Sequence, residues 1–191
     1  MPFKYVKMKN IKQIIREIIT VIIGILIALF INNWNDERKE KKYLDQVYTS
    51  IQKELEESVD GLKTTIPKQL AAADTIQKYI TDSSMSLYNI MIKSDGIHLP
   101  NIRTTSWDAI SNSRIDLIEY EKLAALREIA DRKENLNKRI EKQLDYLFEN
   151  FEDTSRSKKE IMHMMTLDIV GAEKRFQNAL EELVQNNSIK N

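Results

Sequence analysis

Cysteine is absent from this chain of 191 residues, and glycine and proline are scarce, with four and three residues. The lack of cysteine excludes disulfides, thiolate nucleophiles and cysteine-bound zinc. The scarcity of glycine and proline, beside 30% charged residues, favours long helices over the turn-rich pattern of sheet proteins. The sequence therefore predicts an all-α protein.

A net charge is also missing, because 29 basic and 29 acidic side chains cancel. No overall field attracts nucleic acid, so we expect no nucleic-acid partner. The charge is nevertheless uneven. Residues 1–16 carry no acidic residue and a cluster of basic ones, namely Lys4, Lys7, Lys9, Lys12 and Arg16. Next to a membrane, such a cluster favours anionic lipid headgroups.

The longest apolar run follows this basic segment. No charged residue occurs from Ile18 to Asn35, and a helix from Ile14 to Trp34 would be about 31 Å long. A bilayer's hydrocarbon core is about 30 Å thick. We predict a transmembrane helix over residues 14–35, with Arg16 and Trp34 at its two membrane interfaces. The alternatives are a cleaved signal peptide, which lacks its usual A-x-A site here, and a buried helix of a soluble domain.

One face of the predicted span differs from the rest in composition. At about 100° per residue, Thr20, Gly24 and Ala28 lie on one side of the helix, where small side chains let a second helix approach closely. Glu17 and Asn32 add polar groups to this face or to its edge. The sequence thus predicts a packing face made of Glu17, Thr20, Gly24, Ala28 and Asn32.

Basic residues flank both ends of the span, so the orientation depends on a small difference. Five precede it, and Arg38, Lys39, Lys41 and Lys42 follow it. The positive-inside rule favours a cytoplasmic N-terminus. We therefore predict a basic cytoplasmic tail (1–13), the span (14–35), an extracytoplasmic helical bundle (36–185) and a polar tail (186–191).

The segment around the span resembles a family of single-pass membrane proteins of Bacteroidota whose function is unknown. The matching residues are Glu17, Ile18, Val21, the run 24–29, the run 31–35 and Arg38. Arg16, Phe30 and Asp36 depart from the family pattern, which has Gly, Gln and Glu there. A looser similarity covers the stretch from Trp107 to Ile129. The resemblance implies the inner membrane of a Gram-negative cell and brings no activity with it.

Three apolar stripes of helical spacing follow the span. The first runs from Leu44 to Ile80, with a kink or short break expected at Pro67. The others cover residues 119–152 and 156–185. Residues 82–104 hold turn signals, and Thr105–Asp108 reads as a capping box that opens a short helix. We predict that the span continues into the first of these helices and that the three form an antiparallel bundle.

Signals of chemistry are weak. Glu160 and His163 have the E-x-x-H spacing of bundle di-iron sites but lack a second copy. Residues 161–165 (IMHMM) offer soft donors for copper, although neighbouring helix positions point in different directions. Glu54, Glu56, Glu57 and Asp60 fan around a helix, as on a solvated surface. We predict no catalytic residues, no cofactor, no metal and no enzymatic activity.

The sequence thus favours a non-enzymatic, single-pass inner-membrane protein. Its periplasmic bundle would serve as a protein-interaction or assembly subunit. The expected partners are the lipid bilayer and either a second copy of the chain or another envelope protein. The alternative is a sensor-like module that binds a small ligand and signals through a partner.

Overall fold

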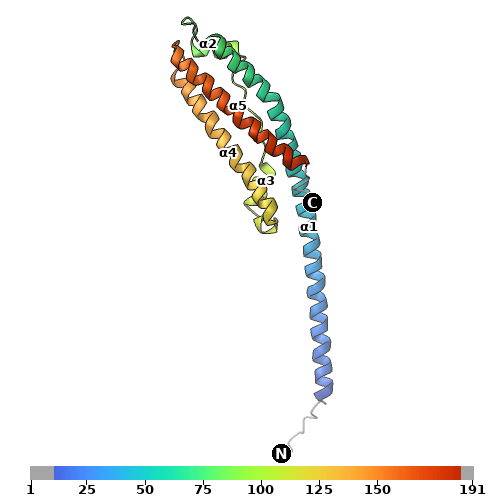
Figure 1. Ribbon diagram of the computed structural model, residues 1–191. Coiled ribbons are helices and arrows are strands. Elements are labelled where there is room, and N and C mark those ends of the chain that lie inside the picture. The colour runs from blue at the N-terminus through green and yellow to red at the C-terminus, as the bar shows by residue number, and fades with distance from the viewer. Residues whose placement is uncertain (1–10, 186–191) are drawn as a thin grey trace, which may run out of the picture. The chain divides into compact units, whose positions relative to one another are not determined.

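The computed structural model describes residues 11–185, so the predicted polar tail and most of the predicted basic tail lie outside it. Every regular element in this range is helical, which confirms the all-α fold class. The elements are α1 (Ile11–Lys78), α2 (Leu87–Lys93), α3 (Thr105–Ser111), the 3-10 turn η1 (Ile115–Leu117), α4 (Tyr120–Glu149) and α5 (Arg156–Gln185) (Figure 1).

Helix α1 contains both the apolar segment and the first long helix of the bundle. No glycine or proline lies between Gly24 and Gly61, so nothing in that stretch interrupts the helix. The helix also continues through Pro67, and the predicted break is absent. Pro67 removes one backbone hydrogen bond, but Ile66 before it and Ala73 after it are both buried, so packing holds the helix on either side. By contacts, the chain divides into two units within α1, at Leu44 and Asp45.

The second unit is a bundle of three long helices. Contacts place the start of α4 beside the early part of α1 in this unit, because the Lys122 ammonium lies 4.7 Å from the Tyr48 ring centre. Helix α5 runs antiparallel to both. Its beginning is tied to residue 82, where the Lys159 ammonium donates to the Asp82 carbonyl. Its end is tied to Lys63 through Glu181, at 3.1 Å.

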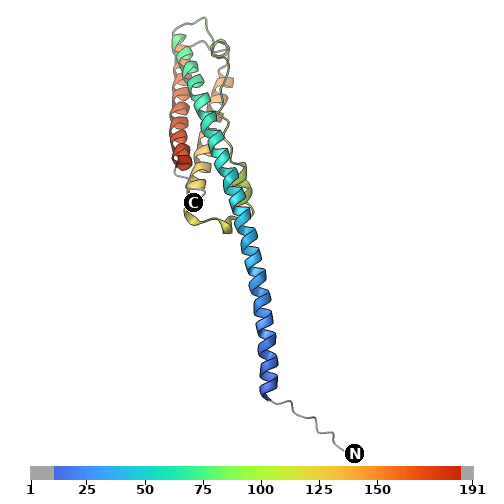
Figure 2. The same ribbon diagram turned by 90° about the vertical axis from the view of Figure 1, so that its right-hand side faces the viewer.

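Helices α1 and α4 run in the same direction because the chain between them travels back along α1. We call residues 94–104 the returning segment, and Figure 2 shows it beside α1. It begins after α2, whose N-cap Ser86 accepts a hydrogen bond from the Asn89 amide, and it ends at α3. Residues 82–104, which hold the turn signals, therefore also include a short helix.

The three long helices share one apolar core. Its fully buried members include Leu62 and Ile76 of α1, Leu126 of α4, and Phe176 and Leu180 of α5. The predicted stripe of α4 is confirmed at its centre. The stripe predicted for α5 is partly wrong. Ile161, Met164 and Leu167, which belong to its apolar residues, are exposed, whereas the polar residues Lys159, Thr166 and Glu173 are buried.

Candidate functional site: an uncovered apolar helix and a polar seam

The apolar part of α1 is not covered by the rest of the described chain. Its large apolar side chains between Ile14 and Trp34 are 40–72% exposed. An 18-residue window has a mean hydropathy of 2.7 and no buried residue. A core helix of a soluble protein would be mostly buried. By length, composition and exposure, this helix is a candidate membrane span.

The residues of the predicted packing face are all exposed in this first unit. A side chain added at Gly24 would meet no atom within 4 Å. Two of the polar members make bonds along the helix: Thr20 Oγ1 donates to the Arg16 carbonyl at 2.9 Å, and Asn32 Nδ2 donates to Asp36 Oδ2 at 3.2 Å. The face is therefore open to a partner helix, and its pairing stays a prediction, as do the interfacial places of Arg16 and Trp34.

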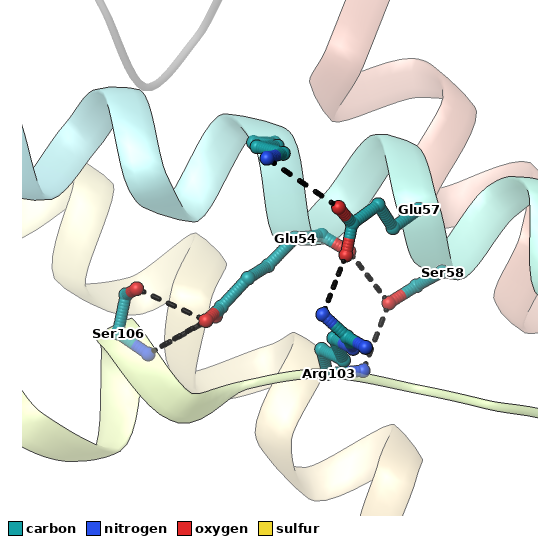
Figure 3. A network of polar contacts seen from close by, with 6 residues as sticks. Glu54, Glu57, Ser58, Arg103 and Ser106 are labelled. Atoms are coloured by element: carbon teal, nitrogen blue, oxygen red, sulfur yellow. Dashed lines mark hydrogen bonds and ion pairs between the residues drawn. The ribbon is translucent and has the colours of Figure 1, made fainter.

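A row of close contacts, most of them polar, joins α1 to the returning segment and to the start of α3 in the second unit (Figure 3). We call the α1 residues that make it, Glu54, Glu57, Ser58, Gly61 and Gln69, the polar seam. The Arg103 guanidinium lies 3.0 Å from a Glu57 carboxylate oxygen, and the Arg103 amide donates to Ser58 Oγ at 3.0 Å. At Gly61, an added Cβ would lie 2.8 Å from the Asn101 carbonyl oxygen, so only glycine lets the two backbones approach this closely.

Glu54 is not a solvated surface residue, contrary to the expectation for the acidic cluster. Its carboxylate accepts hydrogen bonds from the Ser106 amide at 3.0 Å and from Ser106 Oγ at 3.0 Å. The first amides of a helix lack intrahelical partners, and here Glu54 supplies one from α1. The predicted capping box at Thr105–Asp108 is wrong, since the N-cap of α3 is Thr104 and its side chain makes no capping hydrogen bond.

The polar seam ends at a buried pair between α1 and α5. Gln69 Nε2 donates to Glu173 Oε1 at 2.9 Å and to the His98 carbonyl at 2.8 Å, which links both helices to the returning segment. Glu173 has no solvent exposure, and its Oε2 has no hydrogen-bond partner among the described residues. Burial raises the pKa of the Glu173 carboxyl from 4.5 to about 7, while the bond from Gln69 opposes this increase. Glu173 can therefore gain or lose a proton near neutral pH.

A small cavity lies beside this pair. Its volume is about 30 Å³, and Gln69, His98, Gln143 and Thr166 contribute polar atoms to its wall. A cavity of that size has room for about two water molecules. Gln69 Oε1 is buried without a partner among the described residues, so an ordered water would satisfy it.

The weak metal signals of the sequence do not converge in space. The Glu160 carboxylate accepts a bond from Arg156 Nε at 2.7 Å. Met162 is buried in the core, whereas Met164 is 60% exposed, so the soft donors of residues 161–165 point apart. Across residues 11–185, no group of three or more histidine or acidic side chains is placed to hold a metal ion. The absence of a metal and of an enzymatic activity stays a prediction.

Sequence reasoning missed Glu54 and Glu173 because both lie in charged helical stretches. The spacing held one signal for Glu54. Polar or small residues recur every three or four positions, which puts them on one side of α1: Glu54, Ser58, Gly61, Thr65 and Gln69.

Comparison with protein-family models, with curated proteins and with solved structures gives no match for this chain.

Proposed function

We propose that the protein is a non-enzymatic, single-pass inner-membrane protein whose helical bundle lies in the periplasm and acts as an interaction or assembly subunit. The observation that carries the proposal is the uncovered apolar segment of α1, which has a mean hydropathy of 2.7 and no buried residue in its 18-residue window. Water would be a costly solvent for such a surface, whereas lipid is a favourable one.

The interaction role is supported by the face that contains Thr20, Gly24 and Ala28. A side chain added at Gly24 would meet no atom within 4 Å, and small residues four apart are typical of helices that associate in membranes. The basic residues before the span support the cytoplasmic position of the N-terminus. The resemblance to the Bacteroidota family supports the inner membrane as the location.

Topology is the experiment that tests this proposal. Because the chain has no cysteine, Ser155→Cys introduces a single thiol at an exposed position between α4 and α5. We expect a membrane-impermeant maleimide to label it in intact spheroplasts. Lys4→Cys, which precedes the span, should be labelled only after lysis. Ser58→Cys is the buried control, because Ser58 has no exposure. The reverse pattern would place the bundle in the cytoplasm and contradict the proposal.

A sensor-like module that signals through a partner is the second candidate. An open groove of about 530 Å³ between α1 and α5 favours it, with Asp60, Lys63 and Glu181 among its lining residues. Such a charged lining suits a small polar ligand. A ligand that raises the melting temperature of the wild type, but not of Asp60→Ala, would favour this function over assembly.

A further inference from the structure

An aromatic patch lies on the surface where the end of α4 meets α2. Its members are Tyr88 and Ile92 of α2, Phe148 of α4, and Phe151 just beyond α4. The ring centres of Tyr88 and Phe151 are 4.5 Å apart, and those of Phe148 and Phe151 are 6.3 Å apart. Phe148 is 68% exposed, Ile92 59% and Tyr88 40%. Clustered aromatic side chains at this exposure are typical of protein–protein contacts.

The backbone beneath the patch is fixed. The Tyr88 amide donates to the Phe151 carbonyl at 2.9 Å, and the Leu87 amide donates to the Asp153 carbonyl at 3.1 Å. Leu87 and Leu147, directly beside the patch in sequence, are fully or almost fully buried. The aromatic side chains therefore stand on a pre-organised support, which lowers the entropy cost of binding.

The chain around the patch is acidic. Residues 141–155 contain five acidic residues and one basic residue, Lys142. Asp145 and Glu141 precede Phe148 by three and seven residues, which places them on its side of α4. Both are exposed. We call Glu141, Asp145, Glu149 and Glu152 the acidic rim.

Two basic side chains of this region, those of Lys93 and Lys158, are directed at other rings. The Lys93 ammonium lies 5.7 Å from the Tyr79 ring centre, and the Lys158 ammonium lies 5.5 Å from the Tyr146 ring centre. They do not neutralise the acidic rim by direct contact.

We propose that the aromatic patch with its acidic rim is a docking site for a basic, apolar segment of a second protein. The rim repels anionic lipid headgroups and nucleic acid. It also opposes pairing with a second copy, since a symmetric contact brings two acidic rims together. A segment whose apolar side chains are flanked by lysine or arginine can pack on the aromatic rings and form ion pairs with the acidic rim. This inference rests on the proposed interaction function and states the chemistry of the partner.

The test uses the full chain in phosphatidylcholine nanodiscs, with fluorine-labelled phenylalanine. The five phenylalanines give separate reporters, each assigned by a Phe→Leu variant. The probes are two 14-residue amphipathic peptides with the same leucine face, one with lysine and one with glutamate at the remaining positions. We expect the lysine peptide to shift the Phe148 signal saturably and the glutamate peptide to leave it unchanged.

Internal controls separate docking from other effects. Phe176 is buried and should not shift, and Phe30 in the apolar segment reports peptide that enters the bilayer. Phe148→Ser should weaken binding at least tenfold, read from the Phe151 signal, whereas Tyr120→Ser should not. Tyr120 is the matched control because it is 81% exposed and lies at the opposite end of α4.

Charge is tested by a pair of double variants. Glu141→Lys with Asp145→Lys should weaken the lysine peptide at least tenfold. Asp74→Lys with Glu182→Lys changes the net charge equally at exposed positions outside the rim and should not. Four results would overturn the proposal: no Phe148 shift, equal binding of both peptides, equal effects of the two double variants, or a Phe148 shift caused by protein concentration or anionic lipid alone. The topology experiment is independent of all four, so either proposal can fail without the other.

Discussion

Glu173 shows how one side chain can make the stability of a bundle depend on pH. It is a carboxyl group without exposure, and its pKa is raised to about 7. The folded protein therefore holds this proton more tightly than the unfolded chain does. The associated stability is fully present below about pH 4.5 and is lost as the pH rises to about 7.

We predict that Glu173→Gln makes the protein more stable than the wild type above pH 7, by at most about 3 kcal/mol. Glutamine cannot ionise, and its carbonyl can still accept the bond from Gln69. Denaturant unfolding of the full chain in detergent, at pH values from 5 to 8, measures the effect. The variant should lose the decline in the free energy of unfolding between pH 5 and pH 7.

Glu182→Gln is the matched control, because Glu182 lies on the same helix and is exposed. It should keep the pH profile of the wild type. If it flattens the profile as much as Glu173→Gln does, the pH dependence comes from the overall charge and the assignment to Glu173 is wrong.

At the scale of the elements, the contact between α1 and the returning segment depends on Gly61. Glycine usually destabilises a helix, and its replacement by alanine usually raises the stability by about 1 kcal/mol. The Asn101 carbonyl, 2.8 Å from the site of an added Cβ, reverses this expectation, because backbone rather than a flexible side chain would have to move.

We predict that Gly61→Ala destabilises the bundle by about 1–3 kcal/mol, in the range of other overpacked sites. Gly171→Ala is the matched change in α5. Its Cβ would meet only the Arg175 guanidinium, at 3.5 Å, so it should stabilise by up to about 1 kcal/mol. The urea midpoints of the two variants measure the difference. Stabilisation by both changes would mean that the returning segment does not lie against Gly61.

At the scale of the whole molecule, an apolar helix that the chain leaves uncovered joins a bundle with its own core. We predict that the helix associates through Thr20, Gly24 and Ala28. Gly24→Leu would fill the space that a second helix needs and should weaken association about fivefold, or about 1 kcal/mol. Energy transfer between labelled copies in liposomes, at increasing dilution in lipid, measures it.

Ile22→Leu is the control, because residue 22 lies roughly opposite residue 24 on the helix and the change keeps its volume. It should leave association unchanged. A monomeric wild type, or equal effects of both substitutions, would contradict the role of this face.

The sequence by itself determined the helical class, the apolar span and the three long helices to within a few residues. The reason is that periodicity and composition act locally: apolar residues that recur every three or four positions over a long stretch predict a helix wherever it lies. Residues 119–152 and 156–185 match α4 and α5 for this reason. Pro67 is the exception, since its local rule predicted a kink or a short break, and the helix continues through it because packing on both sides holds it.

The tertiary structure alone decided what the charged residues do. Glu54 caps α3 from 52 residues away, and Glu173 lies in the core, while Asp60 on the same kind of helix is exposed. Charge and spacing do not distinguish these glutamates and aspartates, because burial depends on which segment returns to cover each face. The path of residues 94–104 along α1 leads to α3, which meets Glu54, while bonds from the Leu87 and Tyr88 amides to the Asp153 and Phe151 carbonyls hold α2 beside the end of α4, where the aromatic patch forms.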